Sequence, residues 1–397
     1  MNVLPTPGGT DVTASIALPR LMRVGAGASA ELAEVLESLA LARPLIVTDP
    51  FVREQPFFQR ILAHLNRAGL SPGVFARTTP APTTEVVDQG LHALRDGDFD
   101  SLVAVGGGSP IDTAKAVALL GAHGGRMSDY KAPTVTDAPA LPVVAVPTTA
   151  GSGSESTRYS FITDVETDDR MLCAGLAVLP RAALVDFELT LHMPPRLTAD
   201  TGMAALAHAI EAYVSSRANP ISDGLAREAM RALFTHLRSV YADPGDRVAR
   251  EAVMTGATQA GMALSNAGSG LVHAMSRPIG AHFAMAHGPS NAMLLPTVTE
   301  FSLPTAPERY AECARAMGMA APGSTDGEAT GALVWELRLL NEELQVPGPR
   351  AHGIDAERWW ELAPLMAEQA LASDSSADDP RAPTVAEVVE LYHLVYG

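Results

Sequence analysis

Histidines in three stretches of small residues are the first candidates for chemistry in this sequence. His208 lies in ADTGMAALAHAIEAY, His273 in GLVHAMSRPIG and His287 in MAHGPSNAMLLP. A neutral imidazole binds metal ions, and near neutral pH it also accepts or donates protons. A histidine on an apolar helix is often only a core residue, and the spacing does not show that these three meet. The sequence therefore nominates them for metal binding or proton transfer and leaves a structural role open.

A glycine turn is the second candidate, as a site for an anion. Residues 102–105 are apolar and predict a buried strand, and a helical pattern opens at Ser109-Pro110. Between them stand Gly106, Gly107 and Gly108. Glycines let backbone N–H groups approach an anion, and the helix N-terminus adds unpaired donors, so the turn suits a phosphate or pyrophosphate. It lacks the spacing of the usual dinucleotide fingerprint and of a Walker loop, so an ordinary connection stays open.

Two further polar groups follow predicted strands. The apolar run over residues 141–146 leads into PTTAGSGSE, residues 147–155, which offers hydroxyl and amide donors with little bulk. Asp49 ends the strand predicted over residues 44–49. An acid there can accept hydrogen bonds from an adenosine ribose and repel a 2′-phosphate, which favours NAD over NADP. Asp49 before Pro50 is also compatible with a simple turn.

The composition limits the class of protein. A chain of 397 residues suits two domains, and its formal charge of −17 argues against nucleic acid or an anionic membrane as a partner. Cys173 and Cys313 lie far apart, which suggests neither a disulfide framework nor a cysteine zinc site. We see no signal peptide and no apolar run of ~20 residues, so we expect a cytoplasmic protein.

The pattern of elements changes near Pro194-Pro195. Before it, strands alternate with helices, which predicts a parallel sheet with helices on both faces. The predicted helices are 30–41, 51–68, 84–95 and 109–121, and the predicted strands begin near 21, 44, 73, 101, 141, 159 and 183. After it, long helices are predicted over 196–216, 220–240, 247–265, an interrupted pair across 268–298, 306–318, 326–343, 356–371 and 384–395, with loops at 345–353 and 373–383. The expected domains are therefore 1–194 and 195–397, with chemistry in a cleft between them.

Five motifs in this order and at these separations resemble the iron-containing (group III) alcohol dehydrogenase family: GGGSPIDTAK, PTTAGSGSE, TGMxALxHAIEAY, GLVHxM and HGxxNAxLLP. The likeness runs from about Leu21 to Tyr396, and five motifs in register are far more specific than any one of them. The resemblance implies a Rossmann-like α/β domain, an all-α C-terminal domain and a nicotinamide cofactor between them. It also implies a homodimer or larger homo-oligomer.

The resemblance assigns roles to individual residues. The glycine turn would line the pyrophosphate and nicotinamide, the PTTAGSGSE loop would hold adenine and ribose, and Arg170 stands where members often carry a lysine. The implied NAD(H)-binding residues are Asp49, Gly106, Gly107, Gly108, Ser109, Asp112, Thr148, Thr149, Ser152 and Arg170. The usual metal site of the family is one aspartate and three histidines, and His208, His273 and His287 match the histidines.

Two positions depart from the family pattern. The metal-binding aspartate should stand four residues before the first histidine, and that position is Ala204; a histidine usually follows the second ligand by four residues, and that position is Arg277. Losing a carboxylate weakens Fe²⁺ binding more than Zn²⁺ binding, and a nearby guanidinium repels a cation. We therefore expect weak or absent metal binding, unless Glu211 or His282 supplies a replacement ligand.

The expected function is an NAD(H)-dependent oxidoreductase that interconverts a small, anionic aldehyde or ketone and its alcohol. Without a metal, Arg277 would polarise the carbonyl or clamp an anionic group, and one of His208, His273 and His287 would supply the proton. Maleylacetate reductases, a metal-free branch with an altered aspartate position, follow similar logic. Arg277 as a surface or ion-paired arginine stays open. The alternatives are a non-redox lyase of the dehydroquinate synthase type that uses NAD transiently, and a cofactor-binding homologue with reduced catalysis.

Overall fold

The computed structural model describes residues 13–167 and 169–396, which form two units. The first runs from Ala17 to Met193, and the second starts at Pro194 and also includes residues 13–16. The first unit has a sheet and the second is helical. The division falls at Pro194, beside the change of pattern in the sequence.

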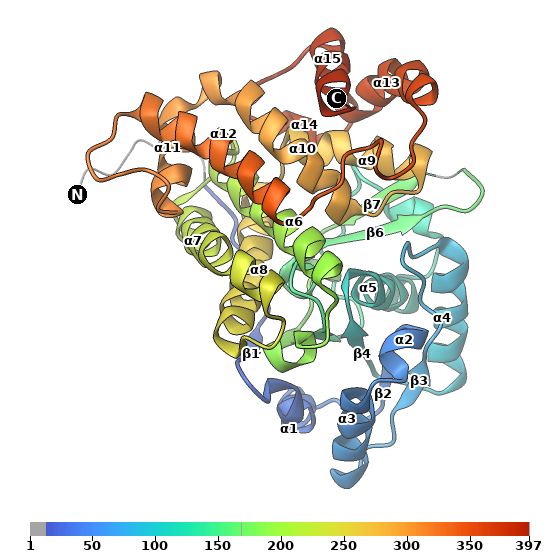
Figure 1. Cartoon of the computed structure of the whole chain (residues 1–397). Coiled ribbons are helices and arrows are strands. Elements are labelled where there is room, and N and C mark those ends of the chain that lie inside the picture. The colour runs from blue at the N-terminus through green and yellow to red at the C-terminus, as the bar shows by residue number, and fades with distance from the viewer. Residues whose placement is uncertain (1–12, 168, 397) are drawn as a thin grey trace. The chain divides into compact units, whose positions relative to one another are not determined.

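Six parallel strands form the sheet of the first unit, in the order β1-β8-β5-β4-β2-β3. Figure 1 labels β1, β4, β2 and β3 of this sheet. The strands are β1 (Leu21–Val24), β2 (Pro44–Val47), β3 (Gly73–Phe75), β4 (Ser101–Gly106), β5 (Val143–Pro147) and β8 (Ala182–Val185). All residues of β2, β4, β5 and β8 are buried. Continuous apolar runs of this kind are typical of parallel strands that are covered on both faces.

Helices cover both faces of this sheet, as the sequence predicts. Side chains alternate along β4, so that Val103 and Val105 pack with α1 (Leu32–Ser38) and α3 (Pro56–Arg67). Leu102 and Ala104 belong to the opposite core, with α4 (Thr84–Asp96) and α5 (Gly108–His123). The expected α/β architecture of the first half is therefore confirmed.

The structure differs from the sequence prediction at three places. The helix expected over 51–68 is two helices, α2 (Pro50–Arg53) and α3, because Pro56 starts a new helix and has no N–H with which to continue the first. The strand β7 (Arg170–Ala174) was not predicted; it pairs antiparallel with β6 (Tyr159–Thr163) and buries only alternate residues. The helix α14 (Asp374–Ala377) lies inside the stretch expected to be a loop, and Ser373 caps it.

The second unit consists of helices that follow the predicted periodicity closely. They are α6 (Pro195–Val214), α7 (Pro220–Ala242), α8 (Arg247–Ala267), α9 (Leu271–Phe283), α10 (His287–Ser302), α11 (Pro307–Ala316), α12 (Asp326–Glu343), α13 (Ala356–Leu371), α14 and α15 (Val385–Tyr396). Side chains cap several N-termini, as Asn219 does for α7 and Asp246 for α8. From Gly202 to Val214 every residue of α6 is buried, so α6 is the central helix, with α7, α8 and α10 packed around it.

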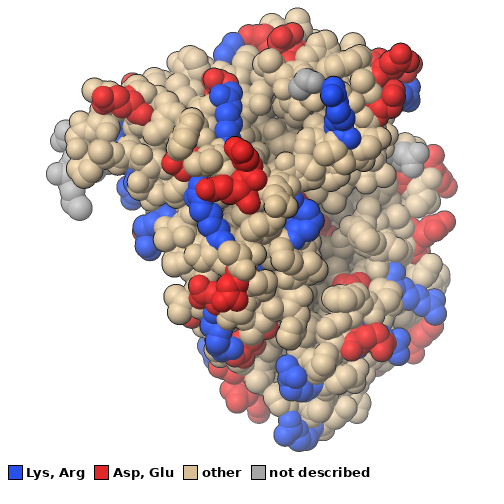
Figure 2. Space-filling view, viewed as in Figure 1, with Lys and Arg blue, Asp and Glu red and all other residues tan. Residues whose placement is uncertain are grey.

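The distribution of surface charge and the hydropathy of the helices agree with the expectations from the composition. On the face shown in Figure 2, the described basic side chains are scattered among acidic ones and form no continuous basic surface. Within the described residues, no helix has the length and apolar character needed to cross a bilayer.

Candidate active site

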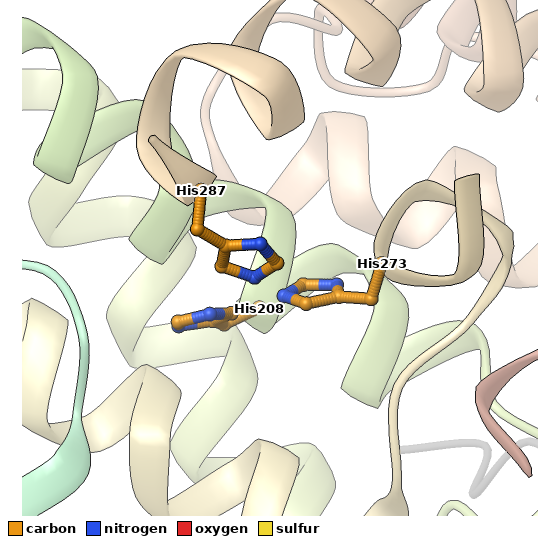
Figure 3. Close-up of side chains that lie close together, drawn as sticks. All are labelled: His208, His273 and His287. Carbon is orange, nitrogen blue, oxygen red and sulfur yellow. The ribbon is translucent and has the colours of Figure 1, made fainter. Parts of the chain in front are cut away.

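The three histidines singled out from the sequence meet inside the helical unit (Figure 3). They come from α6, α9 and α10, and one nitrogen from each lies within 4.8 Å of the others. The ring centroids of His208 and His273 are 4.8 Å apart and stacked, and those of His273 and His287 are 5.1 Å apart. His208 and His273 are buried, whereas His287 is half-buried. The structure thus brings together side chains whose meeting the sequence did not show.

Hydrogen bonds orient two of these rings. Glu211, one turn after His208 on α6, accepts from Nδ1 of His273, and its other oxygen accepts from Val272 N at 2.6 Å. Ser276 Oγ lies 2.7 Å from Nδ1 of His287. These contacts engage the Nδ1 atoms and leave the Nε2 atoms directed toward the cluster.

Asn291 completes the cluster, and the sequence analysis had not assigned it a role. Its Nδ2 atom lies 3.2 Å from Nε2 of His273 and 3.2 Å from Nε2 of His287. Asn291 follows His287 by one helical turn, so the i, i+4 rule would have placed both on one face of α10. Within the described residues, Asn291 Oδ1 and His208 Nδ1 are buried and have no hydrogen-bond partner.

The donor set fits a cation held by imidazoles. Three neutral histidines with an open fourth position form a known type of zinc site. Among the described residues, no carboxylate belongs to the group. Ala204 stands one turn before His208 and is 6% exposed, so it offers only a methyl group there. The three imidazoles are therefore a softer ligand set than one that includes a carboxylate, the hard ligand that Fe²⁺ favours.

The two suggested replacement ligands do not join the cluster. Glu211 contacts His273 at Nδ1 and so stands behind that ring, where it orients it. The Nε2 of His282 lies 2.8 Å from Oε1 of Gln369 in an exposed position. Burial and the neighbouring His273 hold the pKa of His208 well below its usual value, so this ring is neutral.

Arg277 stands one turn after His273 on α9 and is half-buried. Its guanidinium donates to Ser373 Oγ at 2.7 Å and to Ser375 Oγ at 2.8 Å. These two hydroxyl contacts orient the guanidinium.

In the α/β unit, three predicted site segments end neighbouring strands. Asp49 follows β2, the glycine turn follows β4, and Thr148 follows β5; these strands are adjacent and parallel, so the segments share one edge of the sheet. Thr148 N donates to Gly106 O at 2.9 Å, which joins two of them directly. This edge is where open α/β sheets bind their ligands.

The glycine turn and the PTTAGSGSE loop pack closely. A Cβ atom at Gly107 would lie 3.2 Å from Thr149 Oγ1, and one at Gly108 would lie 3.1 Å from Ser152 Cβ. Within the described residues, no side chain caps α5 at Gly107. The first amides of α5 are therefore available to an anion.

Other predicted cofactor residues already have partners in the protein. Asp49 caps α2 by accepting from Val52 N at 2.7 Å, and Ser109 Oγ donates to Pro80 O at 2.6 Å. Asp112 Oδ2 accepts from Phe161 N at 3.2 Å, and Arg170 lies with its guanidinium 5.3 Å from the centre of the Phe161 ring. Asp112 thus lies against the β6–β7 hairpin, to which Arg170 itself belongs, and burial raises the pKa of Asp112.

Lys115 is a second residue that the sequence analysis had not assigned. It lies on α5, is fully buried and donates through Nζ to Thr157 O at 2.9 Å and Tyr159 O at 2.8 Å. These contacts hold the exit of the PTTAGSGSE loop against the helix that carries the glycine turn. A lysine inside the apolar run of α5 was the available signal.

Comparison with known proteins decides the family. Residues 19–187 match the model of iron-containing alcohol dehydrogenase, and residues 198–396 match that of the C-terminal part of the Fe-containing alcohol dehydrogenase family. The chain belongs to the iron-containing alcohol dehydrogenase family. It is accordingly an enzyme, a nicotinamide-dependent oxidoreductase of the alcohol dehydrogenase type, and the lyase alternative is not supported.

Individual members of the family are similar over nearly the whole chain. NAD-dependent methanol dehydrogenase of Bacillus methanolicus is 34% identical over 94% of this chain and 97% of its own. The crystal structure of 1,3-propanediol oxidoreductase has a TM-score of 0.93 and 33% identity, covering 97% of this chain and 100% of its own. Sulfoacetaldehyde reductase of Bifidobacterium kashiwanohense, in complex with NAD⁺, has a TM-score of 0.86 and 26% identity over 97% and 99%.

Proposed function

We propose that this member of the family uses NAD(H) to interconvert a small anionic aldehyde or ketone and its alcohol, with weak or absent dependence on a metal ion. The observation that carries the proposal is the convergence of three histidines and Asn291 beside Ala204, with Arg277 one turn along α9. The histidines supply proton-transfer groups, and we assign the positive charge that meets the substrate to Arg277.

The metal part of the proposal depends on the donor set. A cation, when bound, would be held by His208, His273 and His287 and would polarise the substrate carbonyl. The methyl group of Ala204 contributes no ligand atom, and a guanidinium one turn from His273 disfavours a second positive charge. We therefore assign carbonyl polarisation to hydrogen-bond donors of the protein, with an imidazole as the proton source.

The anionic part of the proposal depends on Arg277. Its planar guanidinium is suited to paired hydrogen bonds with a carboxylate, sulfonate or phosphonate, and Ser373 and Ser375 hold it in place. A similar protein, sulfoacetaldehyde reductase, is named for an aldehyde that carries an anionic group. The preference for NAD over NADP depends on Asp49 at the end of β2, and the NAD⁺ complex of the same relative agrees with it.

The test is NADH oxidation by chelator-treated protein on paired aldehydes of equal length, one neutral and one with a terminal carboxylate, sulfonate or phosphonate. We expect the anionic member of a pair to have the higher kcat/KM, and the activity to persist after chelation. Arg277→Gln should lower kcat/KM for the anionic aldehyde by ~10-fold or more and leave the neutral one nearly unchanged.

Three outcomes would contradict the proposal. Activity that disappears with chelator and returns with Fe²⁺ or Zn²⁺ would contradict metal independence. Equal turnover of both aldehydes in a pair would contradict the role of Arg277. NADH binding without turnover of any aldehyde or ketone would favour the reduced homologue considered above.

Two remaining parts of the proposal come from the family resemblance and the sequence. We propose that the enzyme is a homodimer or larger homo-oligomer and that it acts in the cytoplasm. Light scattering of the purified protein and fractionation of the native cells test these two statements.

A further inference from the structure

A cavity of about 180 Å³ lies inside the α/β unit. It opens between α3, the 3₁₀ helix η1 (Ala28–Glu31) and the 3₁₀ helix η5 (Phe187–Thr190). Among the described residues, those that line it include none of the predicted cofactor residues and no histidine of the cluster. Pockets for drug-sized ligands are typically ~300–1,000 Å³, so this cavity has room for a smaller molecule.

Three basic side chains line this cavity from two directions. Arg60 and His64 stand one turn apart on α3 and share a face of that helix, and His192 follows η5. Within the described parts of the chain, none of these side chains has a hydrogen-bond or ion-pair partner. The chain has 45 acidic residues against 28 lysines and arginines, so acidic partners are abundant elsewhere. Three basic side chains without one, all at a single cavity, can take a bound anion as their partner.

Two acids also line the cavity, and both have other partners. Asp186 is buried, and its Oδ1 atom accepts from Gly27 N at 3.2 Å and Glu188 N at 3.1 Å. Its Oδ2 atom accepts from Ser29 N at 3.1 Å and Ser29 Oγ at 2.6 Å. These four donors occupy the lone pairs of the carboxylate. Glu188 has an interaction of its own, and in the described structure it pairs with none of the three basic side chains.

Much of the remaining wall is apolar and includes Phe57, Ile61 and Leu189. A ligand that fits therefore combines an anionic end with a small hydrocarbon part. A phosphate monoester carries about −1.5 to −2 charges at neutral pH and has three acceptor oxygens, whereas a carboxylate has one charge and two oxygens. Three basic donors match the phosphate better.

We infer that this cavity binds a small aliphatic phosphate monoester, with Arg60, His64 and His192 on the phosphate and the apolar wall against the hydrocarbon. The site is separate from the residues assigned to the cofactor and the substrate. Its occupant joins α3 to the segment that follows η5, and so stabilises the α/β unit. The inference does not depend on the proposed function.

The first experiment is a calorimetric titration with n-propyl phosphate. The protein is saturated with NADH, so that the probe does not take the place of the cofactor phosphates. Wild type, Arg60→Gln and Arg95→Gln are compared at one pH and ionic strength. Arg95 is an exposed arginine on α4, which covers the opposite face of the sheet, and serves as the matched control.

We expect Arg60→Gln to bind the probe ~10-fold or more weakly than wild type, because a hydrogen bond between charged groups is lost, and the control to match wild type. Equal affinities of wild type and Arg60→Gln would overturn the inference, as would the absence of saturable binding to wild type.

Two further probes test the class of ligand. Inorganic phosphate lacks the hydrocarbon part and butanoate lacks the phosphate, so each should bind ~10-fold or more weakly than n-propyl phosphate. Butanoate that binds as tightly would overturn the assignment of a phosphate. Inorganic phosphate that binds as tightly would overturn the assignment of an organic ligand.

The second experiment follows the histidine ring signals of wild type by ¹⁵N NMR. The probe should shift the signals of His64 and His192 and leave that of His123, at the end of α5, unchanged. Signals of His64 and His192 that stay in place at saturating probe would overturn the inference. Neither experiment measures turnover, so a protein that fails to reduce any aldehyde counts against the proposed function alone.

Discussion

Replacing Lys115 by methionine tests how a buried charge supports the α/β unit. The ammonium group is fully buried and donates to Thr157 O, Thr157 Oγ1 and Tyr159 O. Lys115→Met keeps an unbranched side chain, one heavy atom shorter, and removes the charge and all these bonds. It leaves buried carbonyl oxygens without a donor, so at neutral pH we expect the free energy of unfolding to fall by about 3 kcal/mol.

The pH dependence of this loss follows from the pKa of Lys115. Burial lowers it from 10.5 to about 8, against the opposing effect of the carboxylates of Asp112 and Glu155. Between these pH values the unfolded chain keeps a proton that the folded chain has released, so wild type becomes more stable as pH rises. The limit of this gain is about 3 kcal/mol, because each pH unit contributes about 1.4 kcal/mol. Lys115→Met lacks the group, so the difference between the two proteins should widen with pH.

Urea unfolding of both proteins, from neutral pH to about pH 10, measures this difference. Fluorescence and circular dichroism should be followed together, since a chain of two units need not unfold in one step. Lys131→Met is the control: Lys131 is exposed and paired with Asp169, so its loss should change the free energy of unfolding by less than about 1 kcal/mol. A difference between wild type and Lys115→Met that stays constant with pH would refute the argument from burial.

Three further substitutions probe the two candidate sites. Gly108→Ala places a Cβ atom 3.1 Å from the Cβ atom of Ser152, so NADH affinity in a fluorescence titration should fall by ~10-fold. Unchanged affinity would show that the glycine turn does not bind the cofactor. Asp49→Ser keeps a side chain able to cap α2 but loses the negative charge, so the ratio of kcat/KM with NADH to kcat/KM with NADPH should fall by ~10-fold. A constant ratio would show that Asp49 does not determine the choice between the two cofactors. Glu211→Gln weakens the charge-assisted bond to His273, so kcat should fall by ~10–100-fold while the NADH dissociation constant stays the same; a change in NADH affinity alone would contradict this role.

Local sequence signals determine most of the fold. The apolar run before Gly106 specifies β4, and the glycines that follow end it and lead into α5, because strand, turn and helix each favour different residue types. The antiparallel strand β7 was missed because it buries only alternate residues, and a polar arginine begins it. A half-exposed strand has a weak apolar pattern, so its pairing with β6 depends on the surrounding fold.

The candidate sites are less predictable than the elements that carry them. Histidine identity and spacing nominate His208, His273 and His287, but their convergence depends on how α6, α9 and α10 pack. Asn291 is within reach of sequence reasoning, since it lies one turn from His287. The bond of Glu211 to His273 is not, because the two lie 62 residues apart and meet only through helix packing.

The acid that remains near the cluster stands behind the imidazoles. Glu211 Oε1 accepts from Val272 N at 2.6 Å and Asp379 Oδ2 accepts from Leu271 N at 2.9 Å, so two carboxylates stabilise the positive N-terminal end of α9. From there, Glu211 accepts from Nδ1 of His273 and so fixes the orientation of that ring. A carboxylate at position 204 would instead add negative charge on the face of α6 that carries His208, and would repel an anionic substrate. In the proposed mechanism, alanine at 204 and arginine at 277 would leave the proton chemistry to the histidines and the recognition of such a substrate to Arg277.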